Sequence, residues 1–221
     1  MPTVEDTPAV PPVLPTSEAA ATLAVPDTPT EPPTPQENLP TATPATPQPT
    51  ATPMRVTQPT EIASLGKISA LGDSVMLGAA STLKTLGNVQ IDAAVGRQVS
   101  MAITLLSSYH AKGLLGPVVL IHMGNNGTFS AKQFDQIMSI LSDEKYVVFV
   151  NLKVPRSWES PNNDMIAQGV AKYPNAVLVD WRATSADHPE YFAKDAFHMQ
   201  KLGAEVYTNL IGETLRELAR K

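Results

Sequence analysis

The sequence predicts a three-layer α/β/α sandwich with a central five-stranded parallel sheet. Five short runs are rich in Val, Ile and Leu, and segments with helical periodicity separate them. Near-continuous apolar runs are typical of a parallel sheet that is covered on both faces. Regular alternation of strands and helices is typical of a doubly wound fold. About 160 residues remain for it after a Pro- and Thr-rich start, which suits one compact domain.

We expect strands at the five apolar runs, which are 67–72, 89–95, 117–123, 146–152 and 176–180. The intervening periodic segments predict helices at 75–86, 98–112, 130–142, 160–173 and 200–219. In the last of these, apolar residues recur at helical spacing with charges between them. Ligand sites in such folds lie beyond the carboxyl ends of the strands. Candidate functional residues are therefore expected at that edge of the sheet.

The first 60 residues differ in composition from the rest. They hold 16 of the 21 prolines and 14 threonines, with no aromatic residue. Such a segment buries too little apolar surface to offset the entropy lost on ordering, and it favours extended polyproline II. We therefore predict a disordered linker or stalk over 1–60 and one folded domain over 61–221. A spacer in this position leads us to expect a membrane or export segment upstream in the full-length protein.

Charge and composition exclude several functions. The first segment carries six acids and one base (1 − 6 = −5), so it accounts for the whole net charge of −5. The domain is neutral and has no basic run, which argues against nucleic acid as a partner. There is no cysteine, no grouped metal-ligand spacing and no Gly-x-Gly-x-x-Gly after a strand. We therefore expect no disulfide, no metal and no cofactor.

Ser74 follows the first predicted strand directly. The turn reads Gly72-Asp73-Ser74, and the glycine permits a tight backbone there. A serine at a strand-to-helix junction lies where free N–H groups and the helix dipole favour developing negative charge. This position suits a nucleophile. The alternative is a helix N-cap, a role that Ser or Asp fills well.

Two further turns at strand ends carry groups that could stabilise an oxyanion. Gly96 follows the second strand and can offer an unobstructed backbone N–H. Asn126 lies in a Gly124-Asn125-Asn126-Gly127 turn after the third strand, and its side chain can donate an N–H. Ordinary Gly and Asn turns are the alternative explanation for both.

Asp195 and His198 stand three residues apart before the last predicted helix. That offset can bring the carboxylate and the imidazole together on one turn. Asp195 would then hold Nδ1–H and leave Nε2 free to take a proton from Ser74. A capping aspartate beside a surface histidine is the alternative.

The remaining candidates concern substrate binding. Arg97 could contact a sugar or a carboxylate, or be a solvated surface residue. Trp158 could stack on a sugar face, whereas Trp181 is expected to pack over the sheet. His122 follows an apolar strand and is expected to be a satisfied core histidine. His110 and His188 lack convincing partners in the sequence.

Four motifs then agree with one superfamily in order and context: Gly72-Asp73-Ser74, Gly96, Gly124-Asn125-Asn126 and Asp195-x-x-His198. On these motifs, segment 72–198 resembles the SGNH (GDSL-like) hydrolases, whose blocks supply Ser, Gly, Asn and His. The resemblance implies a flavodoxin-like sandwich with Ser74, Asp195 and His198 as catalytic triad. It implies an oxyanion hole made by Ser74, Gly96 and Asn126.

Longer stretches resemble the extracytoplasmic domain fused to acyltransferase-3 membrane proteins, of which peptidoglycan O-acetyltransferases are the best-known members. These stretches are 72–78, 92–98, 122–127, 154–158 and 179–181. The resemblance implies a bacterial, cell-surface, membrane-tethered enzyme that takes an acyl donor and a carbohydrate acceptor, with an upstream membrane acyltransferase domain as partner. Ala196 and Phe197 depart from the family's usual Gly and Val.

The sequence leaves three other functions open. The same residues serve an esterase if water resolves the acyl-serine, so the motifs do not choose between transferase and esterase. A glycan-binding module that has lost its chemistry would keep the fold and the aromatic residues. A cytosolic lipase or thioesterase is disfavoured by the spacer and by the lack of an obvious lid.

Overall fold

The computed structural model describes residues 59–221. The predicted linker over 1–60 lies, except for its last two residues, outside the described residues. A short helix, α1 (Pro59–Ala63), opens the described chain with proline in its first turn, where the missing N–H costs nothing. It packs against the last helix, and Arg220 Nη2 donates to Glu61 Oε2 at 2.9 Å.

Five parallel strands form the central sheet. They are β1 (Ile68–Gly72), β2 (Val89–Ala93), β3 (Val118–His122), β4 (Tyr146–Val150) and β5 (Ala176–Val179). Their order across the sheet is β2-β1-β3-β4-β5, and every neighbouring pair is parallel. The predicted fold class and all five strands are confirmed. β3 lies at the centre with all five residues buried, as its unbroken apolar run predicts.

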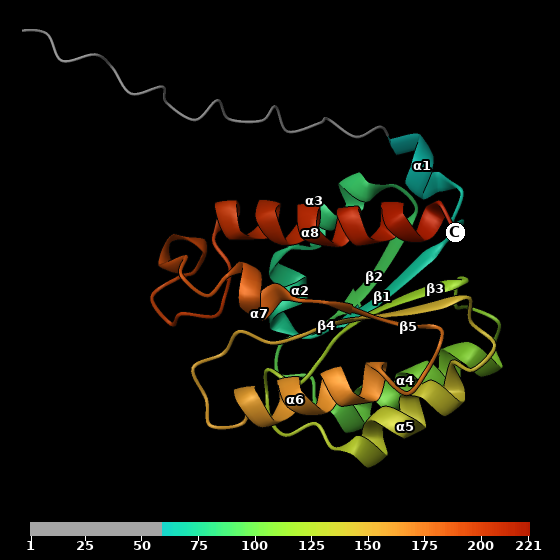
Figure 1. The fold of residues 1–221 in the computed structure, drawn as a ribbon, viewed down its shortest axis with the longest axis horizontal. Helices are drawn as coiled ribbons and strands as arrows, with labels where there is room; N and C mark the ends of the chain where they lie inside the picture. The colour runs from blue at the N-terminus through green and yellow to red at the C-terminus, as the bar shows by residue number, and fades with distance from the viewer. Residues whose placement is uncertain (1–58) are drawn as a thin grey trace, which may run out of the picture. The chain divides into compact units, whose positions relative to one another are not determined.

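Helices cover both faces of the sheet (Figure 1). One face carries α4 (Val99–Ala111), α5 (Ala131–Ile140) and α6 (Glu159–Val170). The long α8 (Lys201–Ala219) covers the other face with the short helices near the start of the domain. Separate clusters of buried apolar side chains fill the two layers between helices and sheet. None of the helices in this described part is long and apolar enough to cross a membrane.

The predicted helix at 75–86 is wrong as a single element. It is divided into α2 (Ser74–Gly78), α3 (Ala80–Leu83) and a 3₁₀ turn, η1 (Lys84–Leu86). Ala79 has φ −95° and ψ 4°, which ends the α-helical hydrogen bonding after Gly78. Helical periodicity survives such a break because the apolar side chains still face the core.

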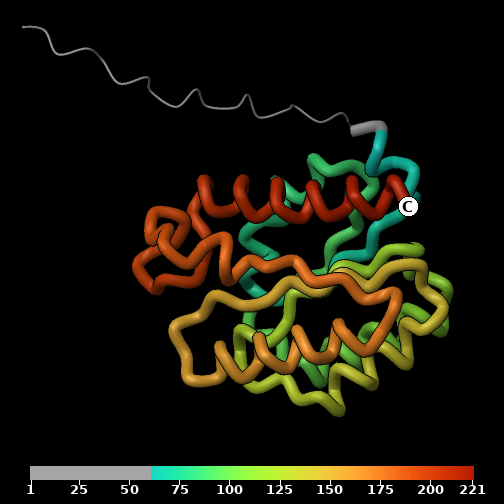
Figure 2. The backbone as a smooth tube through the Cα atoms, viewed as in Figure 1, coloured from blue at the N-terminus to red at the C-terminus, as the bar shows by residue number. Residues whose placement is uncertain are grey.

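Two short elements between β5 and α8 were not predicted, namely α7 (Trp181–Thr184) and η2 (Pro189–Tyr191). Trp181 is fully buried against Tyr207 of α8, with their rings edge to face at 5.3 Å. This confirms that Trp181 packs over the sheet. The backbone tube shows the chain from α7 to α8 looping out at the edge where the strands end (Figure 2).

Candidate active site

Ser74 begins α2 directly after β1. Asp73 is its N-cap, with Oδ1 accepting from the Val75 backbone N–H at 3.0 Å. Asp73 therefore fills the capping role that the sequence left open to Ser or Asp, and the Ser74 hydroxyl stays available for another contact. Gly72 is required because a Cβ there would come within 2.4 Å of the Met76 side chain. The tight strand-to-helix turn thus holds Ser74, 9% exposed, at the edge where the parallel strands end.

His198 and Asp195 come to Ser74 from a loop more than 120 residues further along the chain. His198 Nε2 lies 2.9 Å from Ser74 Oγ, and Nδ1 lies 2.7 Å from Asp195 Oδ2. The other carboxylate oxygen, Oδ1, accepts from the backbone N–H groups of Phe197 and His198. Burial raises the pKa of Asp195, but these hydrogen bonds and the His198 charge outweigh it and hold the pKa below its usual value.

A backbone ladder holds the loop that carries these two residues. The Ala193 N–H donates to the His198 carbonyl at 2.8 Å, and the Gln200 N–H donates to the Tyr191 carbonyl at 2.8 Å. The side chains of His198 and Asp195 are 40% and 43% exposed. The three groups therefore form one continuous chain of contacts that is open to solvent on the His–Asp side.

The predicted oxyanion donors lie on neighbouring loops. Gly96 has φ +71°, a left-handed conformation that glycine adopts without strain. Asn126 Nδ2 donates to the Arg97 carbonyl at 3.4 Å, so the two loops touch. Asn162 of α6 braces the Asn126 loop by donating to the Gly124 and Gly127 carbonyls at 3.1 and 2.9 Å. Nothing in the sequence marks Asn162, because its partners lie more than 30 residues away.

Arg97 is not the surface residue that the sequence suggested. Its side chain is 6% exposed, and Nη2 lies 2.6 Å from Asp92 Oδ1. Nη1 donates to the carbonyls of Asp92 at 2.6 Å and Gly72 at 3.2 Å. The guanidinium is buried and bonds other groups of the protein, although its Nε has no hydrogen-bond partner among the described residues. A glycan contact through Arg97 stays a prediction.

Trp158 lies just before α6 and packs partly buried against the core beneath α4, α5 and α6. Its Nε1 is buried and has no hydrogen-bond partner among the described residues. The idea that Trp158 stacks on a sugar stays a prediction. Phe197 packs against the same core, and its ring centroid lies 4.0 Å from that of His198.

A buried polar network beneath Ser74 was missed by sequence reasoning. Asn125 Nδ2 donates to both Asp73 oxygens, at 3.0 and 3.2 Å, and lies 3.3 Å from His122 Nε2. His122 Nδ1 lies 2.9 Å from the Tyr207 hydroxyl. Burial raises the pKa of Asp73, although hydrogen bonds from Asn125 and Val75 offset part of that effect. The network ties β3 and α8 to the turn that carries Ser74.

His122 is confirmed as a satisfied core histidine, and it makes stability pH-dependent. Burial lowers its pKa from 6.5 to about 3. Between these values the unfolded state binds more protons than the folded state, so the free energy of unfolding falls as pH falls. We expect the protonation of His122 to lower the free energy of unfolding by on the order of 3 kcal/mol between about pH 7 and pH 4.

Urea denaturation of the native protein and His122→Gln at several pH values measures this contribution. The variant should lose less stability on acidification, whatever its stability at neutral pH. The raised pKa of Asp73 has the opposite effect, because it makes the free energy of unfolding rise as pH falls, but Asp73 is present in both proteins. Equal losses in the two proteins would show that His122 is not held neutral.

Ala196 is the one non-glycine residue with positive φ in the part that the structure describes, at +63°. The left-handed conformation costs a residue with a Cβ roughly 1–2 kcal/mol, whereas glycine adds about 0.4–1 kcal/mol of unfolded-state entropy. We therefore expect Ala196→Gly to raise the free energy of unfolding by about 0–1 kcal/mol. Ala193→Gly, in the same loop, should lower it. Chemical denaturation tests this, and equal destabilisation by both changes would contradict it.

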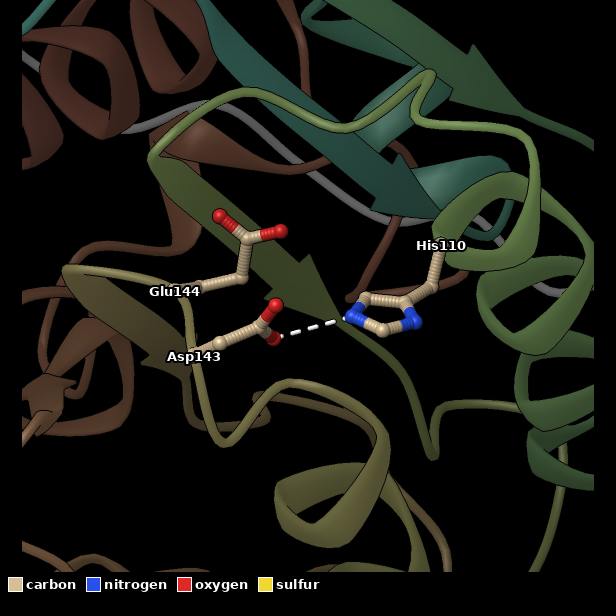
Figure 3. A group of neighbouring side chains, drawn as sticks. All are labelled: His110, Asp143 and Glu144. Atoms are coloured by element: carbon tan, nitrogen blue, oxygen red, sulfur yellow. Dashed lines mark hydrogen bonds and ion pairs between the residues drawn. The ribbon is translucent and has the colours of Figure 1, made fainter.

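His110 and His188 have partners after all. His188 Nδ1 lies 2.8 Å from Glu190 Oε1. Figure 3 shows the His110 ring of α4 facing Asp143, with Nε2 2.9 Å from Oδ1 and Glu144 alongside. Ligand atoms of His110, Asp143 and Glu144 lie within 4.8 Å of one another, so this group could hold a metal ion. The contact that the structure records there is the His110–Asp143 hydrogen bond at the surface.

The fold defines the class. A five-stranded parallel sheet between two helical layers, with a serine at the start of the helix after β1 and an Asp-x-x-His loop before the last helix, is the α/β fold of the SGNH or GDSL hydrolases. No protein-family model matches the chain.

Comparison with known proteins gives particular relatives. The chain is 38% identical over 151 residues to YrhL of Bacillus subtilis, a candidate peptidoglycan O-acetyltransferase. It is 35% identical over 149 residues to the peptidoglycan O-acetyltransferase OatA of Listeria monocytogenes. These matches cover 68% and 67% of this chain but 24% of either relative. The chain is thus homologous to about a quarter of each.

A solved structure agrees with these relatives at the level of the fold. The C-terminal catalytic domain of Streptococcus pneumoniae OatA, determined with a methylsulfonyl adduct, superimposes with a TM-score of 0.64 at 24% identity. The superposition covers 70% of this chain and 95% of that one. The fold inferred from the motifs is therefore confirmed.

Proposed function

We propose that the domain is a serine-dependent O-acetyltransferase that moves an acetyl group to a cell-wall or surface glycan. The observation that carries the proposal is the contact chain from Ser74 Oγ through His198 to Asp195, with distances of 2.9 and 2.7 Å. Nucleophile, base and orienting carboxylate within hydrogen-bond reach are what acyl transfer through a covalent serine requires. Homology to a segment of peptidoglycan O-acetyltransferases supports an acetyl group as cargo and a glycan as acceptor.

The first half-reaction acylates Ser74. Its Oγ attacks the carbonyl carbon of an acetyl ester while its proton passes to His198 Nε2. The developing oxyanion accepts hydrogen bonds from the backbone N–H groups of Ser74 and Gly96 and from Asn126 Nδ2. Asp195 keeps the imidazole oriented and stabilises its charge. Collapse of the intermediate breaks the bond to the donor oxygen, which takes the proton from His198 and leaves.

The second half-reaction returns the enzyme to its starting state. A sugar hydroxyl loses its proton to His198 Nε2 as its oxygen attacks the acetyl carbonyl on Ser74. The same donors stabilise the second oxyanion, and the ester bond to Ser74 breaks with return of the proton to Oγ. Trp158 is the side chain that we assign to contact the acceptor sugar.

The alternative function is a carbohydrate acetyl esterase. The side chains of His198 and Asp195 are 40% and 43% exposed, so water can approach the acyl-serine. Hydrolysis uses the same residues with water in place of the sugar hydroxyl.

We place the reaction outside the cytoplasm, at the cell surface, because the homologous enzymes modify peptidoglycan. On this proposal an upstream membrane domain of the full-length protein delivers the acetyl groups.

The test supplies the purified protein with 4-nitrophenyl acetate, with and without chito-oligosaccharides, and follows the products by mass spectrometry. A transferase gives acetylated oligosaccharide that disappears in Ser74→Ala. An esterase gives nitrophenol and free acetate only, whichever oligosaccharide is present. No turnover that depends on Ser74 would contradict both and favour a glycan-binding module.

A further inference from the structure

We propose that Arg97, whose guanidinium is buried, and the half-buried Asp92 form a clamp that positions the oxyanion donors, with Tyr109 as its support. Arg97 Nη2 pairs with Asp92 Oδ1 at 2.6 Å, and Nη1 reaches the carbonyls of Asp92 and Gly72. The proposal rests on the acyl transfer proposed above. It assigns these residues a positioning role, because none of them touches the reacting atoms.

All three donor-bearing segments attach to Arg97. Its Nη1 holds the carbonyl of Gly72, two residues before Ser74. Gly96, the second donor, is its immediate chain neighbour. Its own carbonyl accepts from Nδ2 of Asn126, the third donor. A shift of the Arg97 backbone would therefore move the Gly96 N–H and release the Asn126 amide at the same time.

The loop around Gly96 has one other side-chain anchor, because Gln98 Nε2 donates to the Asn126 carbonyl at 2.9 Å. Val95 is 79% exposed, and Gly96 and Gln98 are exposed as well. Arg97 is the one buried residue of 95–98, at 7% exposed. The backbone adds a turn in which the Arg97 N–H donates to the Ala94 carbonyl at 3.4 Å. Arg97 is thus the buried anchor of the loop, beside the exposed Gln98 contact and this turn.

Asp92 is itself held from a second side. The Tyr109 hydroxyl of α4 donates to Asp92 Oδ2 at 2.7 Å. Burial raises the pKa of Asp92, but the hydrogen bonds from Arg97 and Tyr109 and the Arg97 charge outweigh it and lower the pKa. Asp92 and Tyr109 also line a cavity of about 400 Å³ between α4 and the sheet. Because Asp92 accepts hydrogen bonds from both Arg97 and Tyr109, the Arg97–Asp92 pair attaches the loop to β2 of the sheet and to α4.

Arg97→Lys tests the clamp because it keeps the charge but loses the planar fork that bonds Asp92 and Gly72 together. We expect kcat for 4-nitrophenyl acetate to fall about tenfold or more, short of the about 10²–10³-fold expected for losing a donor outright. KM should change little. The pH midpoint of kcat should not move, because the Asp195–His198 contact does not involve Arg97. Arg220→Lys, at a remote surface pair, is the matched control and should keep the native rate.

A double-mutant cycle separates positioning from general structural support. If Arg97 acts through Asn126, Arg97→Lys should lower kcat by a smaller factor in the Asn126→Ala protein than in the native protein, since the effects of coupled sites are not additive. If the factors by which the two single substitutions lower kcat multiply in the double variant, the proposal is overturned. Asp92→Asn, which weakens the clamp from its other end, should lower kcat in the same way. It replaces Arg97→Lys if thermal melting shows that variant to be unfolded.

One readout does not need activity. Hydrogen exchange of the Gly96 amide and the NMR signal of the Asn126 side-chain amide report the donors directly. Both should change in Arg97→Lys and stay native in Arg220→Lys. Loss of Ser74-dependent turnover in the native protein would defeat the proposed function, whereas native exchange and native kcat in Arg97→Lys would defeat the clamp.

Discussion

Replacing Ser74 by alanine is expected to lower kcat for acetyl ester turnover by a factor on the order of 10⁶, the loss typical of removing a serine nucleophile. The covalent intermediate then has no atom on which to form, and His198 has no proton to take. Among the described residues the hydroxyl makes one side-chain hydrogen bond, to His198 Nε2, so the variant should fold normally. Steady-state kinetics with 4-nitrophenyl acetate, together with a thermal melt, measures both effects.

Ser142→Ala is the control for Ser74→Ala. Ser142 is an exposed serine after α5, and its loss should leave the rate native. A Ser74→Ala protein that keeps more than about a hundredth of the native rate would contradict the nucleophile assignment, because residual catalysis by binding alone lies far lower.

Asp195→Asn is expected to lower kcat by a factor of about 10⁴, the loss seen when the aspartate of a serine triad becomes an amide. The Asn amide can donate to Nδ1 and so favours the imidazole tautomer that carries the proton on Nε2, where it cannot accept from Ser74. The Asn oxygen can still accept from the backbone N–H groups of Phe197 and His198. The loop that carries residue 195 should therefore keep its conformation in Asp195→Asn, and only the negative charge of the side chain should be lost.

The pH profile checks the cause of that loss. The pKa of Asp195 lies below its usual value, so the native carboxylate stays ionised throughout the neutral range. Asp180→Asn is the matched control, since the Asp180 carboxylate also accepts from a nearby backbone N–H group, that of Ala183, but does not contact His198. An Asp195→Asn rate within tenfold of native across the pH range would show that Asp195 does not orient the base.

The sheet and the place of the site were predictable because each depends on a local pattern. The run Val118–Ile121 is apolar throughout, as a central parallel strand must be, and β3 is buried throughout. Carboxyl ends of parallel strands meet at one edge, so Ser74, Gly96 and Asn126 had to lie close in space once the strands were assigned. The Asp195–His198 offset predicted their contact for the same local reason.

Long-range pairing of polar side chains could not be predicted in this way. Arg97 follows an exposed glycine, and nothing local shows that its guanidinium turns inward to Asp92. His122 and Tyr207 meet across 85 residues, and Asp143 reaches His110 across 33. Such contacts depend on how helices lie on the sheet, which periodicity does not specify.

The most direct test of acyl transfer through Ser74 is to look for the covalent intermediate. The protein is mixed with 4-nitrophenyl acetate, quenched in acid within a turnover, and examined by intact mass spectrometry and peptide mapping. We expect one acetyl group on the peptide that contains Ser74, located on Ser74 itself and lost on adding the acceptor oligosaccharide. Ser74→Ala should not acquire it. Full ester turnover with no acetyl on Ser74, or with the same acetylation in Ser74→Ala, would contradict a covalent mechanism through Ser74.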